Sequence, residues 1–349
     1  MGHNSFGTVF TITTFGESHG DALGVVVDGV EPGFLVDQEA LQREMDRRRP
    51  GSNPTGTERN EIDKLSVLSG LYEGYTTGTP IAMILYSTNQ RSADYSHLKD
   101  VFRPGHADWT FEQKYGRRDI RGGGRSSGRE TSARVAAGAL AKQLLAKRGI
   151  QITAGTVQVG PIKAEKRHWD DREPLLSCPD REAAQAMVSL IEEVRQQKDS
   201  IGGVIECRVQ GLPVGLGEPV FGKLDALLSH AVMSIGAVKG IQFGDGFACA
   251  TMRGSECNDQ RTSEGFLSNH AGGVLGGISS GQELVLQAAI KPTSSIGKPQ
   301  LTVNKANETV TLEVQGRHDP CICGRAVVVV EAMVAITLLD LYYTAFGRA

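Results

Sequence analysis

The spacing of apolar residues predicts helices in four segments of the chain. Apolar residues in these segments recur three or four positions apart, as on one face of a helix: residues 36–49, 127–148, 179–198 and 223–235. The first begins near Asp37, a favourable N-cap, and ends before Pro50, which stops a helix. The second is rich in alanine and closes at Gly149, so we expect another helix to pack closely against it.

The longest apolar run, residues 326–341, is interrupted by Glu331 and Asp340. It is short for a membrane span, so we expect a buried core helix and no membrane segment. A buried carboxylate without a partner costs on the order of several kcal/mol. Asp340 is therefore either satisfied by a neighbour or poised as a base, and the sequence leaves both possibilities open.

Short β-rich runs between glycine turns predict strands at residues 9–14, 25–27, 65–71, 80–86, 150–159, 202–209 and 283–290. The order strand, turn, helix at residues 24–49 recurs at residues 202–235, about half a chain later. We therefore predict a single domain over residues 1–349, with two pseudo-repeated halves at roughly 1–150 and 195–349. The predicted fold class is α+β, a β-α-β sandwich in which central helices pack between antiparallel sheets.

Composition describes an ordinary globular protein. The 349 residues are 40% hydrophobic and 22% charged, with a formal net charge of −3, which disfavours disorder and non-specific binding to nucleic acid. The six cysteines have no paired CxxC spacing, so neither a zinc site nor a disulfide framework is predicted. The first seven residues lack the features of a secretory signal, and we expect a cytoplasmic protein with reduced thiols.

Residues 117–134 depart from this background because they contain six arginines and only two acidic residues. Three successive glycines, residues 122–124, allow conformations that a Cβ forbids, and Ser127 with Glu130 predicts a capping box at a helix start. Amides at a helix start and guanidinium groups both favour an anion. We therefore predict an anion-binding loop; a solvated basic surface loop is the alternative.

Other polar segments add candidate chemistry. The three arginines of residues 47–49 exceed what a helix dipole requires, which predicts a second anion site. Lys291 precedes three hydroxyl residues, a combination that can bind a phosphate. No Walker A motif and no Rossmann fingerprint occurs in the sequence. His19 lies in a glycine-flanked turn, and a lone histidine there is more often structural than catalytic. Residues 88–116 are predicted to form a long irregular loop of the kind that often carries function.

Seven motifs together make the chain similar to the chorismate synthase family. They are TTFGESHG (13–20), DRRRPG (46–51), FRPGHAD (102–108), RGGGRSS (121–127), SNHAGG (268–273), KPTSS (291–295) and GRHDP (316–320). The resemblance runs from about Phe6 to Leu341. It implies a lyase of the shikimate pathway, which serves aromatic amino-acid biosynthesis. Such an enzyme converts 5-enolpyruvylshikimate 3-phosphate to chorismate by 1,4-anti elimination of phosphate, using reduced FMN with no net redox change.

The resemblance also implies site residues. The acid–base residues would be His19 near the leaving phosphate, His106 near the flavin, and Asp340 assisting the proton exchange of the flavin. Flavin contacts would fall on Arg125, Ser126, Ser127, Gly236, Ala237, Gly276, Lys291, Pro292, Thr293, Ser294, Ser295 and Arg317. Substrate anions would lie against Arg47, Arg48, Arg49, Arg134 and Arg325. No metal is implied.

The partners implied are the substrate, three further copies in a homotetramer, and a separate flavin reductase or other external reductant, with NADPH acting only indirectly. One departure concerns residues 52–55, where many relatives place an arginine that this chain lacks, although Arg59 lies nearby. Two rival functions remain open: a non-catalytic protein that binds a phosphorylated ligand or RNA, and an ordinary flavin oxidoreductase.

Overall fold

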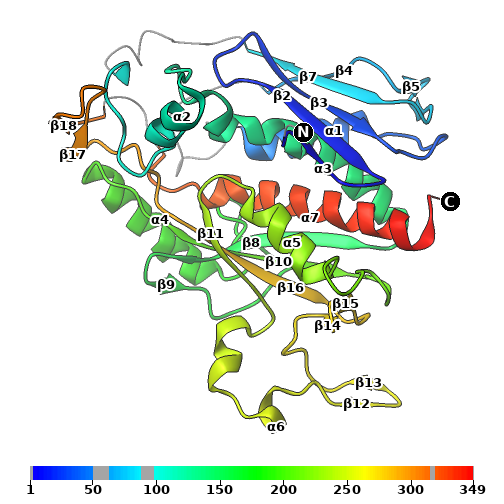
Figure 1. Ribbon diagram of the computed structural model, residues 1–349. Coiled ribbons are helices and arrows are strands. Elements are labelled where there is room, and N and C mark those ends of the chain that lie inside the picture. Colours follow the sequence, from blue (N-terminus) through cyan, green and yellow to red (C-terminus); the bar gives the residue numbers. More distant parts are fainter. Residues whose placement is uncertain (1–2, 50–62, 88–97, 315–318, 349) are drawn as a thin grey trace.

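Two five-stranded antiparallel sheets lie on opposite sides of a pair of long helices (Figure 1). The computed structural model describes residues 3–49, 63–87, 98–314 and 319–348. The first sheet has the order β1 (Ser5–Phe6), β2 (Thr11–Gly16), β3 (Ala22–Asp28), β7 (Ile81–Tyr86) and β4 (Leu65–Val67). The second has the order β11 (Val238–Phe243), β16 (Leu284–Ile290), β10 (Gly203–Gln210), β8 (Gln151–Val159) and β9 (Ile162–Lys163). Alternate residues of β7 and β16 are buried, as expected of strands with one face against a core.

The central helices are α3 (Thr131–Ala146) and α7 (Cys323–Phe346), with α1 (Gln38–Arg48) packed against both. Small residues permit the close contact that the alanine-rich sequence predicts. A Cβ on Gly138 of α3 would lie 2.3 Å from the Cβ of Ala332 on α7. In the part of the chain that the structure describes, α7 is the one helix long and apolar enough to cross a membrane, and 89% of its apolar window is buried inside the protein. The expected buried core helix is therefore confirmed.

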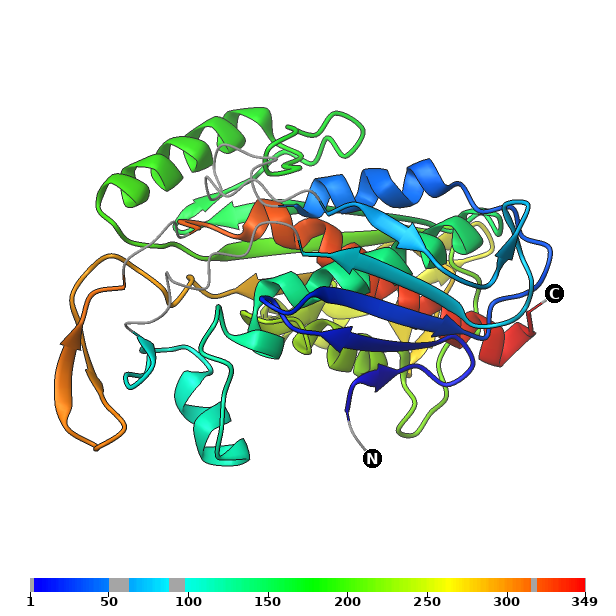
Figure 2. The same cartoon turned by 90° about the horizontal axis from the view of Figure 1, so that it is seen from above.

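The remaining elements lie around this core. The other helices are α2 (Asp108–Tyr115), α4 (Arg181–Gln196), α5 (Leu224–Met233) and α6 (Gly254–Cys257). Four short hairpins are β5–β6 (Leu71–Tyr72, Tyr75–Thr76), β12–β13 (Arg261–Thr262, Gly265–Phe266), β14–β15 (Val274–Leu275, Ile278–Ser279) and β17–β18 (Gln300–Val303, Thr309–Leu312). Figure 2 shows α2 and the β17–β18 hairpin at the end of the molecule opposite the C-terminus.

The four predicted helices are confirmed within a few residues at each end, and the mixed helix and strand content fits the predicted α+β class. Two local predictions are wrong. The predicted irregular loop, where the structure describes it, contains α2, which is supported by contact between the Phe111 and Tyr115 rings and closed by left-handed Gly116. The capping box is absent: the Ser127 hydroxyl accepts from the amide of Arg129, but the Glu130 carboxylate pairs with Arg134. Helix α3 consequently begins at Thr131, after short 3-10 turns.

Candidate active site

Residues 122–124 form a loop against which both predicted catalytic histidines pack. All three glycines have positive φ, a conformation that other residues rarely adopt. A Cβ on Gly122 would lie 2.4 Å from Cε1 of His19, and one on Gly123 would lie 3.1 Å from Cε1 of His106. The bare backbone of this loop therefore allows two imidazoles, from segments far apart in sequence, to approach neighbouring residues.

Each histidine is held by polar neighbours. The hydroxyl of Ser18 lies 3.2 Å from Nδ1 of His19 and donates to the carbonyl of Arg121, which ties the turn to the glycine loop. Nδ1 of His106 lies 2.9 Å from the carboxylate of Asp108. Burial lowers the pKa of His106, so its ring is uncharged at neutral pH.

The segment after β16 lies beside the His106 loop. The ammonium of Lys291 donates to the carbonyls of Gly105 and Pro292, at 3.2 and 3.4 Å. Its backbone amide donates to the carbonyl of Ala237, so the predicted flavin contacts at residues 236–237 and 291–295 are neighbours. Burial and the charge of Lys239 lower the pKa of Lys291. Among the described residues no carboxylate pairs with Lys291, which leaves its charge available to an anion.

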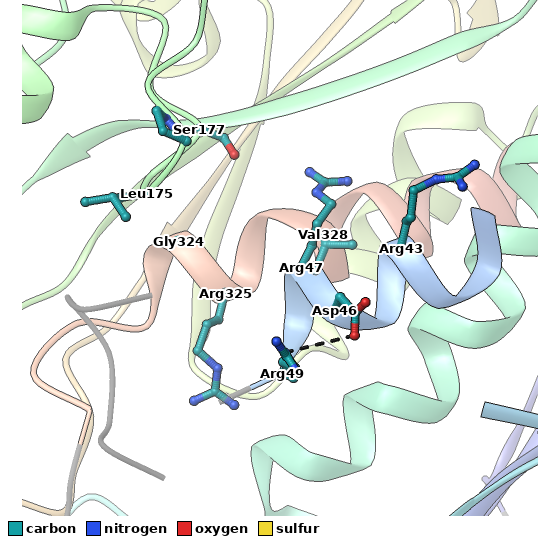
Figure 3. Close-up of a pocket in the computed structure, with 10 residues that line it drawn as sticks. Arg43, Asp46, Arg47, Arg49, Leu175, Ser177, Gly324, Arg325 and Val328 are labelled. Carbon is teal, nitrogen blue, oxygen red and sulfur yellow. Dashed lines mark ion pairs between the residues drawn. The ribbon is translucent and has the colours of Figure 1, made fainter. Parts of the chain in front are cut away.

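The end of α1 and the start of α7 meet at a basic cavity of about 400 Å³ (Figure 3). It is lined by Arg43, Asp46, Arg47, Arg49, Pro174, Leu175, Ser177, Gly324, Arg325 and Val328. Arg325 donates to the carbonyl of Arg48 at 3.2 Å and pairs with Asp319 at 2.8 Å. The carbonyl of Asp319 accepts from the hydroxyl of Thr293, so this cavity is linked to the segment that follows β16.

All five arginines predicted to bind substrate are paired with carboxylates of the chain, and three of those carboxylates are buried. Arg48 is only 2% exposed, pairs with Asp63 and donates to the carbonyl of Gly128. Arg47 pairs with the buried Glu331, and Arg134 pairs with Glu130. Arg49 and Arg325 also have partners, Asp46 at 4.0 Å and Asp319 at 2.8 Å, but these carboxylates are 47% and 18% exposed. Figure 3 shows the Arg49 pair with Asp46 and Arg325 at the start of α7, so these two ion pairs are the more open to an external anion.

Four of the six arginines in residues 117–134 are largely buried, whereas Arg117 and Arg121 are exposed. The side chains of Arg118, Arg125, Arg129 and Arg134 are 3%, 25%, 11% and 18% exposed. Arg125 donates to Asn4, to the carbonyl of Gly16 and to the hydroxyl of Thr14, which fixes the loop to β2. Arg125, Ser126 and Arg134 also line a second cavity, of about 440 Å³.

Other predicted site residues lie elsewhere within the chain. Asp340 accepts from the amides of Thr8, Val9 and Phe10 at 2.6 to 3.0 Å. It lies 15 residues after Arg325, about 22 Å along α7 at 1.5 Å per residue. These amide contacts satisfy its carboxylate, the structural possibility that the sequence left open. Gly276 lies in the β14–β15 hairpin where β16 begins, whereas Lys291 follows the end of β16. Arg317, residues 52–55 and Arg59 lie outside the described residues.

Sequence reasoning missed three buried carboxylates that organise the basic residues. Asp63 holds Arg48 and Arg129, Asp108 holds Arg103 and Arg118, and Glu331 holds Arg47 and Lys142. The available signal for Glu331 was an acid inside an apolar run, the argument that was applied only to Asp340. Among the described residues, no group of three His, Cys, Asp or Glu side chains could hold a metal ion.

Comparison with known proteins covers nearly the whole chain. The family model described as chorismate synthase matches residues 10–343. A solved crystal structure of a chorismate synthase is similar to the chain, with a TM-score of 0.73 and 29% sequence identity. The alignment covers 97% of this chain and 92% of that one. The chain therefore belongs to the chorismate synthase family, whose members are lyases that form chorismate for aromatic amino-acid biosynthesis.

Proposed function

We propose that this protein converts 5-enolpyruvylshikimate 3-phosphate to chorismate by 1,4-anti elimination of phosphate, with reduced FMN bound and no net redox change. The observation that carries the proposal is the approach of His19 and His106 to neighbouring residues of one glycine loop. A protein that only binds a phosphorylated ligand needs the arginines but not two acid–base groups at one place. The convergence of both histidines with the basic segments therefore favours an enzyme.

His19 is proposed to meet the developing charge of the departing phosphate, and His106 to exchange a proton beside the flavin. The glycine-flanked turn that carries His19 allows a ligand close approach, and a phosphate would favour its protonated form. Asp340 is proposed to assist the proton exchange of the flavin. Within one chain its carboxylate accepts from the amides of Thr8, Val9 and Phe10.

The residues near Lys291 fit a flavin phosphate. Lys239 and Lys291 lie close enough for one charge to lower the pKa of the other, and a phosphate would neutralise both. Reduced FMN, when bound, would supply its electrons without being consumed. We propose that it is held by Arg125, Ser126, Ser127, Gly236, Ala237, Gly276, Lys291, Pro292, Thr293, Ser294, Ser295 and Arg317.

The substrate carries a phosphate and two carboxylates, which we assign to the arginines at the end of α1 and the start of α7. Arg49 and Arg325 are proposed to contact these anions directly. Arg47, Arg48 and Arg134 are proposed to contribute positive potential, because the carboxylates that they pair with are buried, whereas the partners of Arg49 and Arg325 are more exposed. Arg325 donates to the carbonyl of Arg48 and so fixes the end of α1.

The wider setting is also a proposal. We propose a cytoplasmic homotetramer that receives reduced flavin from a separate reductase or other external reductant, with NADPH acting only through that reductant. We further propose one domain of two pseudo-repeated halves arranged as a sandwich. One hydrophobic core that contains residues from Phe10 to Tyr343 supports the single domain.

The test is anaerobic incubation of the protein with reduced FMN and 5-enolpyruvylshikimate 3-phosphate, followed by measurement of phosphate, chorismate and flavin oxidation state. We expect phosphate and chorismate in equal amounts over many turnovers, with the flavin still reduced. Oxidation of one flavin per product would favour an ordinary flavin oxidoreductase instead. Tight ligand binding without product would favour the non-catalytic binding protein.

A further inference from the structure

Asp108 lies beside His106 in a pocket of opposing charges. Its carboxylate is 3% exposed and lies 2.9 Å from Nδ1 of the imidazole. The same carboxylate accepts from the Arg103 backbone amide at 3.1 Å and from two guanidinium nitrogens of Arg103 at 2.7 and 2.8 Å. A nitrogen of Arg118 lies 2.8 Å from it. With this many partners, the carboxylate cannot rotate without breaking several contacts at once.

The position of Asp108 is not explained by its helix. It is the first residue of α2, where an acid often satisfies free amides, but α2 has no side-chain cap. The carboxylate points back toward Arg103 and His106 instead. On the other side of the ring, the position of a Cβ on Gly123 would be 3.1 Å from Cε1 and 3.5 Å from Nε2. The imidazole therefore lies with Nδ1 at Asp108 and its Cε1–Nε2 edge at the glycine loop.

We propose that Asp108 is the positioning residue of His106: it accepts the Nδ1 proton, fixes that tautomer and leaves Nε2 free to take a proton at the glycine loop. Its role in turnover rests on the proposed function, but the tautomer does not. Nδ1 is buried, and among the described residues the Asp108 carboxylate at 2.9 Å is the group positioned to accept its proton.

The surrounding charges keep the ring ready to accept a proton. Burial lowers the pKa of His106, and Arg103 and Arg118 lower it further, whereas Asp108 raises it. Burial disfavours the charged form of Asp108, but Arg103 and His106 outweigh this and hold the pKa of Asp108 far below its usual range. Of the other charged groups nearby, Glu112 pairs with Arg118 and Lys305, and Lys291 donates to the carbonyl of Gly105, next to His106. A charged carboxylate beside a neutral imidazole is the arrangement that orients a histidine base.

The test uses the full-length protein with 15N-labelled histidine and follows the two ring nitrogens of His106 by NMR against pH. In the wild type we expect a proton on Nδ1 and a pKa below 6.5, the ordinary value for histidine. Asp108→Asn removes a charge that favours the imidazolium and adds an amide donor. It should lower the pKa by about 1 to 3 units and mix the tautomers. Arg118→Gln should raise the pKa, because it removes a positive charge.

Opposite shifts of the His106 pKa in Asp108→Asn and Arg118→Gln distinguish positioning of the ring from a general loosening of the loop. Glu112→Gln is the matched control on the same helix, since Glu112 pairs with Arg118 and Asp108 is the carboxylate beside His106; it should leave the tautomer unchanged. Asp108→Glu keeps the charge and should restore the wild-type tautomer in part. An unchanged His106 tautomer in Asp108→Asn would overturn the proposal.

Turnover then tests the role in the reaction. Asp108→Asn should lower kcat about 10²- to 10⁴-fold, the range that a correctly oriented histidine base contributes, with little change in the KM of the substrate. Wild-type kcat in a variant with mixed tautomers would also overturn the positioning role. If wild type and variants all lack turnover while the NMR result is as expected, the proposed function fails and the tautomer assignment stands.

Discussion

At the scale of single residues, the two histidines are expected to contribute separately. General acid–base groups typically contribute about 10²- to 10⁴-fold, so His19→Ala and His106→Ala should each lower turnover by amounts in that range with the fold intact. His106→Ala should also alter the absorbance spectrum of bound reduced flavin. His19→Ala should leave that spectrum unchanged and slow phosphate release.

The comparison requires saturating reduced FMN and a circular dichroism control for folding. If both variants keep near-normal turnover under these conditions, the acid–base assignment is wrong and both histidines are structural. His19 would then have only a structural role, as a hydrogen-bonded histidine that Ser18 holds beside the glycine loop.

Glu331 is the residue on which we expect stability to depend most. Its side chain is 2% exposed and accepts from Arg47, Lys142 and the amide of Ala154. Glu331→Gln would leave two cations without their shared carboxylate, and loss of one partner of a buried pair costs about 3 to 5 kcal/mol. Urea denaturation measures this difference. Lys166→Ala is the control, because the Lys166 pair with Glu182 is exposed and its loss should leave the transition unchanged.

The same carboxylate predicts a pH dependence. Burial opposes ionisation of Glu331, but Lys142 and Arg47 outweigh it and lower its pKa to about 2 from an ordinary value of 4.5. Because the folded pKa is the lower one, the stabilisation is fully present above pH 4.5 and is lost as the pH falls toward 2. Wild type should therefore lose more stability than Glu331→Gln across this window. Parallel losses in the two proteins would contradict the assignment.

At the scale of elements, the glycine loop depends on the absence of a Cβ. Gly122→Ala would place a methyl group 2.4 Å from the His19 ring at φ +70°. Gly149→Ala is a matched control, with φ +76° and open space around the new Cβ. Both variants should lose about 1 to 2 kcal/mol from the left-handed conformation. Only Gly122→Ala should lose kcat as well, and equal kcat in the two variants would separate His19 from catalysis.

The contact between α3 and α7 gives a second element-scale prediction. Gly138→Ala should favour the helix by about 1 kcal/mol from propensity alone. The new Cβ would however lie 2.3 Å from the Cβ and 2.4 Å from the Cα of Ala332, and overpacking typically costs about 1 to 3 kcal/mol. We therefore expect a lower midpoint of thermal unfolding. Gly128→Ala, with nothing near the new Cβ, is the control; a stabilised Gly138→Ala would show that the helices separate at little cost.

The elements were largely predictable from the sequence, because their signals are local. The spacing of apolar residues predicted α1, α3, α4 and α5, and the longest apolar run predicted α7. The partners of charged residues were not predictable, because each pairing joins distant segments: Arg47 meets Glu331, and Arg48 meets Asp63. Counting arginines indicated an anion site, yet all five that were assigned to substrate are already paired with carboxylates of the protein itself. No local pattern distinguishes an arginine that binds a ligand from one that holds the loop.

At the scale of the whole molecule, the candidate site is assembled from segments that span the sequence. The turn with His19 and the loop with His106 both meet the glycine loop, and Lys291 contacts the carbonyl of Gly105, next to His106. Gly276 and Asp340 do not join them within one chain. If these two residues do serve the flavin, a second copy of the chain must bring them to the site.

Flavin binding should therefore depend on association of several copies of the chain. Phe221 and Phe247 are 93% and 84% exposed, and burying such rings against another copy stabilises association by about 25 cal/mol per Å². We expect a tetramer in sedimentation at micromolar concentration, and dissociation in the double variant Phe221→Asp, Phe247→Asp. The dissociated protein should stay folded and bind reduced FMN more weakly, because Gly276 of another copy is lost. Leu301→Asp, at an apolar residue that is 74% exposed on the β17–β18 hairpin, is the control. A folded monomer that binds FMN as tightly as the wild type would place the whole flavin site within one chain and remove Gly276 from it.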